Sequence, residues 1–276
     1  MAVPIEADQV HAGADLQIWR RKHPSLEESS SERPSFLSPS GPVLTEKVVI
    51  SRAFQGDASV LLAAWKTSGE VAWTCTKERC SGLSATAEKV YVSSAGSFDC
   101  LDHSTGEVHW QISEAARRPH SSIAPSGGRL YFWGRPFRDF WGRRALESDN
   151  PFPVTCIDGA SGALLWRTER PGCVPTAPLA VDGKIIANEK GVIFALDALD
   201  GRLLWTHDTG GRISRRLIAG LGGVLVKFAD RIRLLRSEDG GTVADWSWPE
   251  RLISYLAAGR NQAFAVRSVP TDVIFG

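Results

Sequence analysis

Short apolar runs, broken by polar turns, recur along most of the chain. The segment 177–197 is typical, because its apolar stretches are interrupted at Asp182-Gly183, a dipeptide that favours a tight turn. Segments 84–102 and 218–235 repeat the arrangement. Apolar runs of this length bounded by glycine and aspartate indicate β-strands. The pattern therefore predicts an all-β chain in which each such segment supplies about three short antiparallel strands.

A second pattern joins a polar turn to a tryptophan. In four windows the tryptophan comes four residues after a glycine: Gly69/Trp73, Gly106/Trp110, Gly162/Trp166 and Gly201/Trp205. A fifth window, 234–246, has two extra residues before Trp246. Glycine supplies the positive φ that a tight turn needs, and an aspartate entering the turn can bond its amides. Each window therefore predicts a hairpin of two antiparallel strands.

Side-chain alternation sets the expected surroundings of each tryptophan. The residue six before the glycine is small in all four regular windows: Ala63, Cys100, Cys156 and Ala195. We expect it opposite the indole, where a small side chain leaves room for the ring. The residue two after the glycine should lie on the tryptophan's own face. These residues, Val71, Val108, Leu164 and Leu203, are therefore expected to be buried.

The spacing of the windows predicts the architecture. The tryptophans fall at residues 73, 110, 166, 205 and 246, so the intervals are 37, 56, 39 and 41 residues. Periods near 40 are typical of the four-stranded blades of β-propellers. Three strands between windows and one tryptophan strand make such a blade.

The windows 100–110 and 195–205 resemble the motif Ala-x-Asp-x-x-Thr-Gly-x-x-x-Trp, the tryptophan-docking motif of PQQ-like (pyrroloquinoline-quinone repeat) propellers. The resemblance extends over about residues 43–258. It implies that the tryptophans tie neighbouring blades together. We carry this structural role to Trp73, Trp110, Trp166, Trp205 and the less regular Trp246, with the turn glycines Gly69, Gly106, Gly162 and Gly201.

The same resemblance raises the question of catalysis, because PQQ-like repeats also build quinoprotein dehydrogenases. For those enzymes it implies a calcium-and-quinone site with carboxylate ligands, usually a disulfide between adjacent cysteines, and a longer chain. No adjacent cysteines occur here, and the six histidines form no recognisable nucleophile arrangement. We therefore expect no catalytic residue, cofactor or metal, with a quinone- or small-ligand-dependent enzyme as the alternative.

We expect one propeller domain over residues 1–276, most simply of six blades. Residues 41–251 would form five blades, and 252–276 the first strands of the last. Residues 1–22, which include Trp19, would close the ring by pairing as the last strand of that blade. The Ser-, Glu- and Pro-rich segment 23–40 predicts a surface loop, with a docking or phosphorylation segment as the alternative. Seven blades or a partial ring are the other possibilities.

Charge differs between the two ends of the strands. Linkers that follow the tryptophan strands are basic: Arg20, Arg21, Lys22, Lys77, Arg79, Arg117, Arg118, Arg167, Arg170, Arg212, Arg215, Arg216 and Arg251. The hairpin turns are acidic: Glu70, Asp102, Glu107, Asp158, Asp197, Asp200, Glu238 and Asp239. Because strands alternate in direction, linkers and turns should emerge on opposite faces. The alternative is a mixed, solvated rim.

The longest interval contains an insertion, 133–153, which we expect between the second and third strands of its blade, on the linker face. Aromatic and basic residues interleave in it: Trp133, Arg135, Phe137, Arg138, Phe140, Trp141, Arg143 and Arg144. Such a composition is used at protein interfaces and in stacking on nucleic acid. With Arg117, Arg118, Arg215 and Arg216 it predicts a site for a protein partner. A nucleic acid, or packing of the aromatics on the propeller's own rim, is the alternative.

Composition adds little to this picture. The net charge is +1 and 43% of residues are hydrophobic, which is ordinary for a globular domain. Five cysteines, an odd number, argue against a full disulfide framework. Cys100 and Cys156 are expected as buried small residues, and Cys75 with Cys80 as at most half a metal site.

Two further expectations concern the axis and the location of the protein. Residues at the starts of the first strands, Ser81, Ser122, Thr176, Arg216 and Ser254, could line an axial funnel for a small anion or peptide end. Short polar residues are also needed there for packing alone. A cytoplasmic location without membrane contact is expected, because no long apolar stretch or secretory signal pattern occurs. A signal peptide removed before the numbering would change that expectation.

Overall fold

A computed structural model describes most of the chain as β-strands. The described residues are 42–55, 58–78, 80–94, 97–112, 119–134, 152–170, 178–189, 191–210, 217–228, 231–247, 252–258 and 263–268. They contain no helix, and so none that could span a membrane. The prediction of an all-β chain is confirmed.

Five four-stranded antiparallel sheets follow one another in sequence order. Blade 1 consists of β1 (Val43–Leu44), β2 (Val48–Gln55), β3 (Ala58–Trp65) and β4 (Val71–Glu78). Blade 2 consists of β5 (Gly82–Ala85), β6 (Lys89–Ser93), β7 (Phe98–Asp102) and β8 (Val108–Ile112). Blade 3 consists of β9 (Pro119–Ser126), β10 (Arg129–Gly134), β11 (Phe152–Asp158) and β12 (Leu164–Arg170). Blade 4 consists of β13 (Leu179–Val181), β14 (Lys184–Glu189), β15 (Val192–Asp197) and β16 (Leu203–Asp208). Blade 5 consists of β17 (Leu217–Gly220), β18 (Gly223–Lys227), β19 (Arg231–Leu235) and β20 (Thr242–Ser247).

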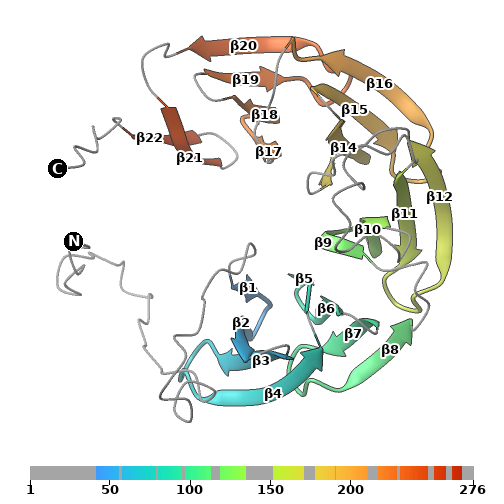
Figure 1. Cartoon of the computed structure of the whole chain (residues 1–276), viewed down its shortest axis with the longest axis vertical. Coiled ribbons are helices and arrows are strands. Elements are labelled where there is room, and N and C mark those ends of the chain that lie inside the picture. The colour runs from blue at the N-terminus through green and yellow to red at the C-terminus, as the bar shows by residue number, and fades with distance from the viewer. Residues whose placement is uncertain are drawn as a thin grey trace, which may run out of the picture.

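A sixth sheet contains two strands among the described residues, β21 (Leu252–Ala258) and β22 (Ala263–Ser268). The first strands of successive sheets contact one another in the order β1, β5, β9, β13, β17, β21, so the sheets surround a common centre (Figure 1). This is the predicted propeller. The predicted closing strand, within residues 1–22, lies outside the described residues, as does the segment 23–40.

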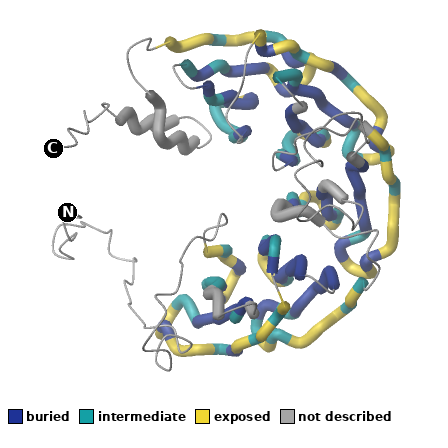
Figure 2. Tube along the Cα trace, viewed as in Figure 1, coloured by how far each residue is buried: buried dark blue, intermediate teal, exposed yellow. Residues whose placement is uncertain are grey.

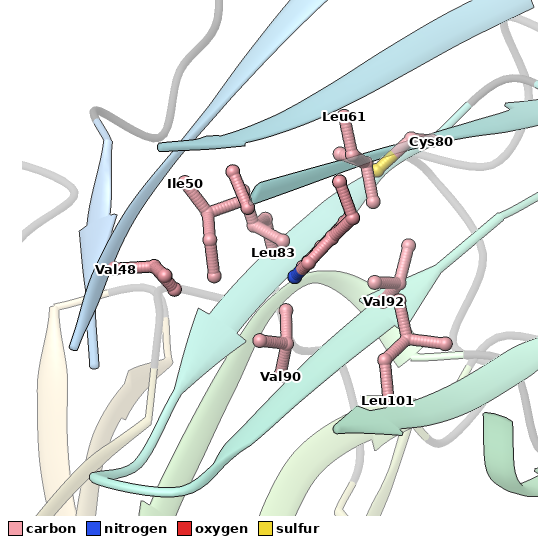
Figure 3. Packing of buried hydrophobic residues seen from close by; sticks show 10 residues of the cluster. Val48, Ile50, Leu61, Cys80, Leu83, Val90, Val92 and Leu101 are labelled. Carbon is pink, nitrogen blue, oxygen red and sulfur yellow. The ribbon is translucent and has the colours of Figure 1, made fainter. Parts of the chain in front are cut away.

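The core lies between blades as well as within them. One cluster joins β2 and β3 of blade 1 to β5, β6 and β7 of blade 2, and includes Ile50, Leu61, Leu83, Val92 and Leu101 (Figure 3). Three further clusters join blades 2 and 3, 3 and 4, and 4 and 5. Exposure is concentrated on the outermost strand of each blade (Figure 2). Blades 2, 3 and 4 therefore bury both of their faces against neighbouring blades.

The strand register confirms the small residue opposite each regular tryptophan. The paired residues are Ala63 and Trp73, Cys100 and Trp110, Cys156 and Trp166, and Ala195 and Trp205. Cys100 and Cys156 are fully buried, as the sequence predicts.

The prediction for the aliphatic residues beside the turns is wrong. Val71, Val108, Leu164 and Leu203 are 37%, 51%, 43% and 42% exposed. A register shift lies between each of them and its tryptophan: Ala63 opposes Trp73, but the next residue, Ala64, opposes Val71. An extra residue on one strand interrupts the alternation of side chains, so period-two reasoning fails across it.

The fifth window also differs from the prediction. Leu234 stands six residues before Gly240, and it opposes Ala244, which holds the place of the tryptophan in the other windows. Trp246 lies two residues further along β20, opposite Ile232, and is 39% exposed. The two extra residues thus carry Trp246 beyond the position that we had assigned to it.

Candidate functional site

The regular tryptophans lie against the turn glycines of the following blade. A Cβ atom added to Gly106 would lie 2.8 Å from Cδ2 of Trp73. The equivalent distances are 3.1 Å from Gly162 to Trp110, 2.6 Å from Gly201 to Trp166 and 2.6 Å from Gly240 to Trp205. At Gly106, Gly201 and Gly240 a Cβ would overlap the ring, and at Gly162 the ring would have to shift by a few tenths of an ångström. Each glycine also has a positive φ, between 73° and 76°.

Each indole N–H group also donates a hydrogen bond to the turn on which the indole packs. The Nε1 atoms donate to the carbonyl oxygen three residues before the glycine: Trp73 to His103 at 2.9 Å, Trp110 to Gly159 at 3.2 Å, Trp166 to Ala198 at 3.2 Å and Trp205 to Ser237 at 3.0 Å. Packing and a hydrogen bond therefore act at one place in each junction. The sequence supplied the residues, but it did not supply their partners in the next blade.

The aspartates that enter these turns hold the turns together. Oδ1 of Asp102 accepts from the amides of Ser104 at 2.7 Å and Thr105 at 2.8 Å. Oδ1 of Asp158 accepts from the hydroxyl and the amide of Ser161, both at 2.7 Å. Hydrogen bonds from Ser161 lower the pKa of Asp158. Slight burial raises the pKa of Asp102, but the bonds from Thr105 and Ser104 outweigh it and lower the pKa overall. The carboxylates of Asp102 and Asp158 therefore stabilise their turns.

The turn face also carries basic residues, which were not predicted from the sequence. Nη1 of Arg129, at the start of β10, donates to the carbonyls of Ala198 at 3.0 Å and Leu199 at 2.9 Å in the next blade. Nζ of Lys89, at the start of β6, reaches the carbonyl of Gly159 at 3.5 Å. A signal was present in the sequence, because a basic residue opens the second strand in blades 2, 3 and 4. The turn face is therefore less acidic than we predicted.

On the linker side, the junction of blades 1 and 2 contains a closed ionic network. Nζ of Lys77, near the end of β4, lies 2.6 Å from Oδ2 of the fully buried Asp99 in β7. The same carboxylate accepts from Ser97 Oγ at 2.9 Å and Gln111 Nε2 at 2.8 Å. The ammonium of Lys77 is thus paired with one carboxylate, and both oxygens of that carboxylate accept hydrogen bonds.

The junction of blades 4 and 5 is different. Arg233 donates from Nε and Nη2 to Oδ2 of Asp245 at 2.9 and 2.7 Å, and its Nη1 lies 3.5 Å from Nε2 of His207. Burial and the Arg233 guanidinium lower the pKa of His207, which favours a neutral ring that can accept. The carboxylate of Asp245 is therefore paired with the guanidinium of Arg233.

Among the described residues, no carboxylate pairs with the guanidinium of Arg231. Its guanidinium carbon lies 4.2 Å from the centre of the Phe228 ring, and its Nη2 is 3.5 Å from the carbonyl of Thr209. Its buried Nε has no acceptor among the described residues. Because Arg231 directly follows the connection between β18 and β19, it belongs to the linker side of the propeller.

Most of the predicted partner-binding residues cannot be compared with the structure. Trp133 lies in β10, where it is paired with Val154 of β11. The others lie outside the described residues: Arg117, Arg118, Arg135, Phe137, Arg138, Phe140, Trp141, Arg143, Arg144, Arg215 and Arg216. The described strands β10 and β11 end and begin at Gly134 and Phe152, so residues 135–151 connect them.

The remaining candidates offer little chemistry. Ser81 Oγ lies 3.0 Å from Ser93 Oγ, so this residue of the proposed axial funnel has a partner within its own blade. Burial raises the pKa of the Cys80 thiol, despite Arg52 Nη1 at 3.4 Å from Sγ. Among the described residues, no three His, Cys, Asp or Glu side chains come together to hold a metal ion.

Comparisons with known proteins agree with the geometry of the docking tryptophans. Residues 142–249 match the family described as outer membrane protein assembly factor BamB. The crystal structure of BamB from Moraxella catarrhalis superposes with a TM-score of 0.54 at 14% identity, over 83% of this chain and 76% of that one. The chain has a β-propeller fold similar to that of PQQ-like propellers. The resemblance that we drew from the windows is thus confirmed.

Other solved propellers show how widely this fold is used. The computationally designed Ika8 protein has a TM-score of 0.54 at 15% identity, over 79% of this chain and 67% of that one. A quinohemoprotein alcohol dehydrogenase from Comamonas testosteroni has a TM-score of 0.53 at 13% identity, over 82% of this chain and 45% of that one. The chain thus spans less than half of that enzyme. No curated protein sequence matches the chain.

Proposed function

We propose that this PQQ-like propeller is a non-catalytic interaction scaffold that binds a protein partner through its linker face. The partner would contact the aromatic and arginine residues of 133–144 together with Arg117, Arg118, Arg215 and Arg216. Two findings support the proposal: the family match to an assembly factor, and a fold whose neighbours include BamB. Propellers serve many functions, so the fold alone does not select one.

The positive charge at the junction of blades 4 and 5 is the reason for assigning the partner to the linker face. Among the described residues the Nε of Arg231 has no acceptor, whereas on the equivalent side of the junction between blades 1 and 2 the charge of Lys77 is neutralised by Asp99. The positive charge of the Arg231 guanidinium would be complemented by an acidic group of a partner. The predicted basic residues 212, 215, 216 and 251 flank the same blade in the sequence.

The proposal is tested by comparing variants of the two faces. We expect Trp141→Ala with Arg143→Glu to abolish co-purification of the partner from the native host, and Arg231→Gln to weaken it. Arg202→Gln, on the turn face, is the matched control, because its guanidinium is 68% exposed and pairs only at 3.9 Å. A partner that remains bound to the linker-face variants would disprove the assigned surface.

The enzymatic alternative is kept because the fold also occurs in the quinohemoprotein alcohol dehydrogenase. It predicts that purified protein, supplied with calcium and pyrroloquinoline quinone, reduces an artificial dye in the presence of an alcohol. The nucleic-acid alternative predicts binding to single strands that weakens steeply with salt. The cytoplasmic location stays a prediction, which fractionation of the native host would test.

A further inference from the structure

Blade 5 places two arginines on the face that it turns toward blade 4. Arg231 and Arg233 lie in β19 on the same face as Leu235, which belongs to the core between blades 4 and 5. The strand register aligns Arg233 with one residue in each of blades 2, 3 and 4: Asp99, Thr155 and Phe194. It aligns Arg231 with Ser97, Pro153 and Val192. Among these four blades, the basic pair is thus a property of blade 5.

The ring of Phe228 lies beside both arginines. The guanidinium carbons of Arg231 and Arg233 are 4.2 and 5.6 Å from the centre of the ring, and Phe228 is buried. A guanidinium over an aromatic face is attracted by the ring, while the N–H groups along its edge stay able to bind an acceptor. Phe228 therefore holds the Arg231 guanidinium in place without neutralising its charge.

The two guanidiniums differ in their acceptors. Arg233 donates from Nε and Nη2 to Oδ2 of Asp245 at 2.9 and 2.7 Å. For Arg231, the acceptor among the described residues is the carbonyl of Thr209, which is 3.5 Å from Nη2 and thus further than in an ordinary N–H···O bond. Arg231 is only partly buried. Its guanidinium therefore keeps N–H groups that can bind an acceptor from another molecule.

The charge at this place selects the class of ligand. Arg231 and Arg233 carry two positive charges and Asp245 carries one negative charge, which leaves one positive charge. Burial and the Arg233 guanidinium lower the pKa of His207, so its ring is neutral at neutral pH. The adjacent charged residues belong to the opposite faces of their strands: Asp208 and Lys227. A ligand with one negative charge would therefore balance the site.

We propose that Arg231, held by Phe228, binds a carboxylate from an acidic side chain of a protein partner on the linker side of the junction between blades 4 and 5. A carboxylate carries a single charge and two oxygens in the plane that a guanidinium matches, so it can accept two N–H bonds at once. The site itself depends only on residues of blades 4 and 5. The assignment of its carboxylate to a protein partner rests on the proposed function.

Nuclear magnetic resonance of the arginine Nε–H groups tests the site in the whole protein. The Nε atom of Arg231 is buried, which slows exchange of its proton with water. The probe is N-acetyl-glutamate amide, added near neutral pH at constant ionic strength, and N-acetyl-glutamine amide is its uncharged counterpart. We expect a saturable shift of the Arg231 signal with the glutamate probe, in the millimolar range because so small a ligand makes few contacts. The glutamine probe should cause none.

Variants connect the binding to Arg231, with the backbone amides of Thr209 and Phe228 as reporters. Arg231→Gln should abolish the shift of these amides. Arg231→Lys should weaken binding, because an ammonium keeps the charge but lacks the planar pair of donors. If Arg231→Gln does not fold, the lysine variant carries the test. Arg202→Gln is the matched control and should bind as the unaltered protein does, because Arg202 lies on the turn face with a 68% exposed side chain.

Three results would overturn the proposal. A shift that is equally large with chloride, or that rises without saturation, would reflect salt screening alone. Tighter binding of sulfate than of the glutamate probe would assign the site to a divalent oxyanion. If the probe binds but Arg231→Gln still co-purifies with the partner, the carboxylate site stands and the partner is not its source. Loss of the partner from Trp141→Ala with Arg143→Glu, without binding of the probe, would instead support the proposed function and remove this site.

Discussion

At the scale of single residues, the two ionic junctions on the linker side differ in how completely they are paired. Lys77 and Asp99 neutralise one another in a buried place, and Asp99 is fully buried. At the other junction Arg233 pairs with the carboxylate of Asp245 and contacts His207. The first arrangement should matter for stability at all pH values near neutrality, and the second should make stability depend on pH.

Removal of the lysine should be strongly destabilising. Lys77→Met leaves the buried Asp99 carboxylate without its counter-charge, for which about 3–5 kcal/mol is expected. Chemical denaturation measures the change. Arg202→Met is the control, since its pair with Asp200 is exposed and should contribute less than about 1 kcal/mol. Equal small losses for both variants would show that the Asp99 network tolerates the missing ammonium.

His207 should reduce stability on acidification. Its pKa in the folded protein lies below the ordinary value of 6.5, so the unfolded chain takes up the proton first. The free energy of unfolding should therefore be fully retained above pH 6.5 and fall as the pH drops from there to the lowered pKa. Urea unfolding between pH 5 and 8 measures this, and His207→Gln should remove that part of the slope. An unchanged slope in the variant would refute the assignment.

At the scale of the elements, the turn and the bulged strand after it form the unit of docking. The tight turn was predictable from Gly and Asp, because local backbone conformation selects those residues. The bulge was not, because the residues around it are ordinary strand formers. It exposes Val71 and its counterparts while it leaves the indoles buried or half-buried. In blade 5 the same geometry places Ala244, and not Trp246, at the docking position.

Substitution of two glycines separates backbone strain from docking. Gly201→Ala and Gly183→Ala both place an alanine at positive φ, 76° and 70°, which costs about 1–2 kcal/mol. Only Gly201→Ala also meets an indole, with Trp166 at 2.6 Å, and about 1–3 kcal/mol more is expected from the overpacking. Denaturant midpoints compare the two variants. If both lose the same stability, the indole adjusts freely and does not constrain the junction.

At the scale of the whole molecule, adjoining blades share a core and an indole contact at each of the four junctions between blades 1 and 5. No blade can unfold without exposing its neighbour's buried face. Although repeat architectures can lose cooperativity, we expect a single unfolding transition here. Far-ultraviolet circular dichroism and tryptophan fluorescence should give coincident curves. Separate transitions would show that groups of blades fold independently.

The sequence by itself determined the all-β class, the blade period and the residues that face each other across the tryptophan strands. These depend on local turn chemistry and on a spacing that repeats, and both can be read along one chain. The prediction of the linker face as a partner site stays untested, because all of its assigned residues except Trp133 lie outside the described part of the chain.

Tertiary structure alone decided which carbonyl and glycine receive each indole, which charges are neutralised, and which aliphatic residues are exposed. The reason is physical: these properties depend on contacts between blades about 30 to 70 residues apart in the chain, and on one-residue register shifts. Lys77 looked like a solvated linker residue in the sequence, and only the packing of β7 beside β4 gave it the buried partner Asp99.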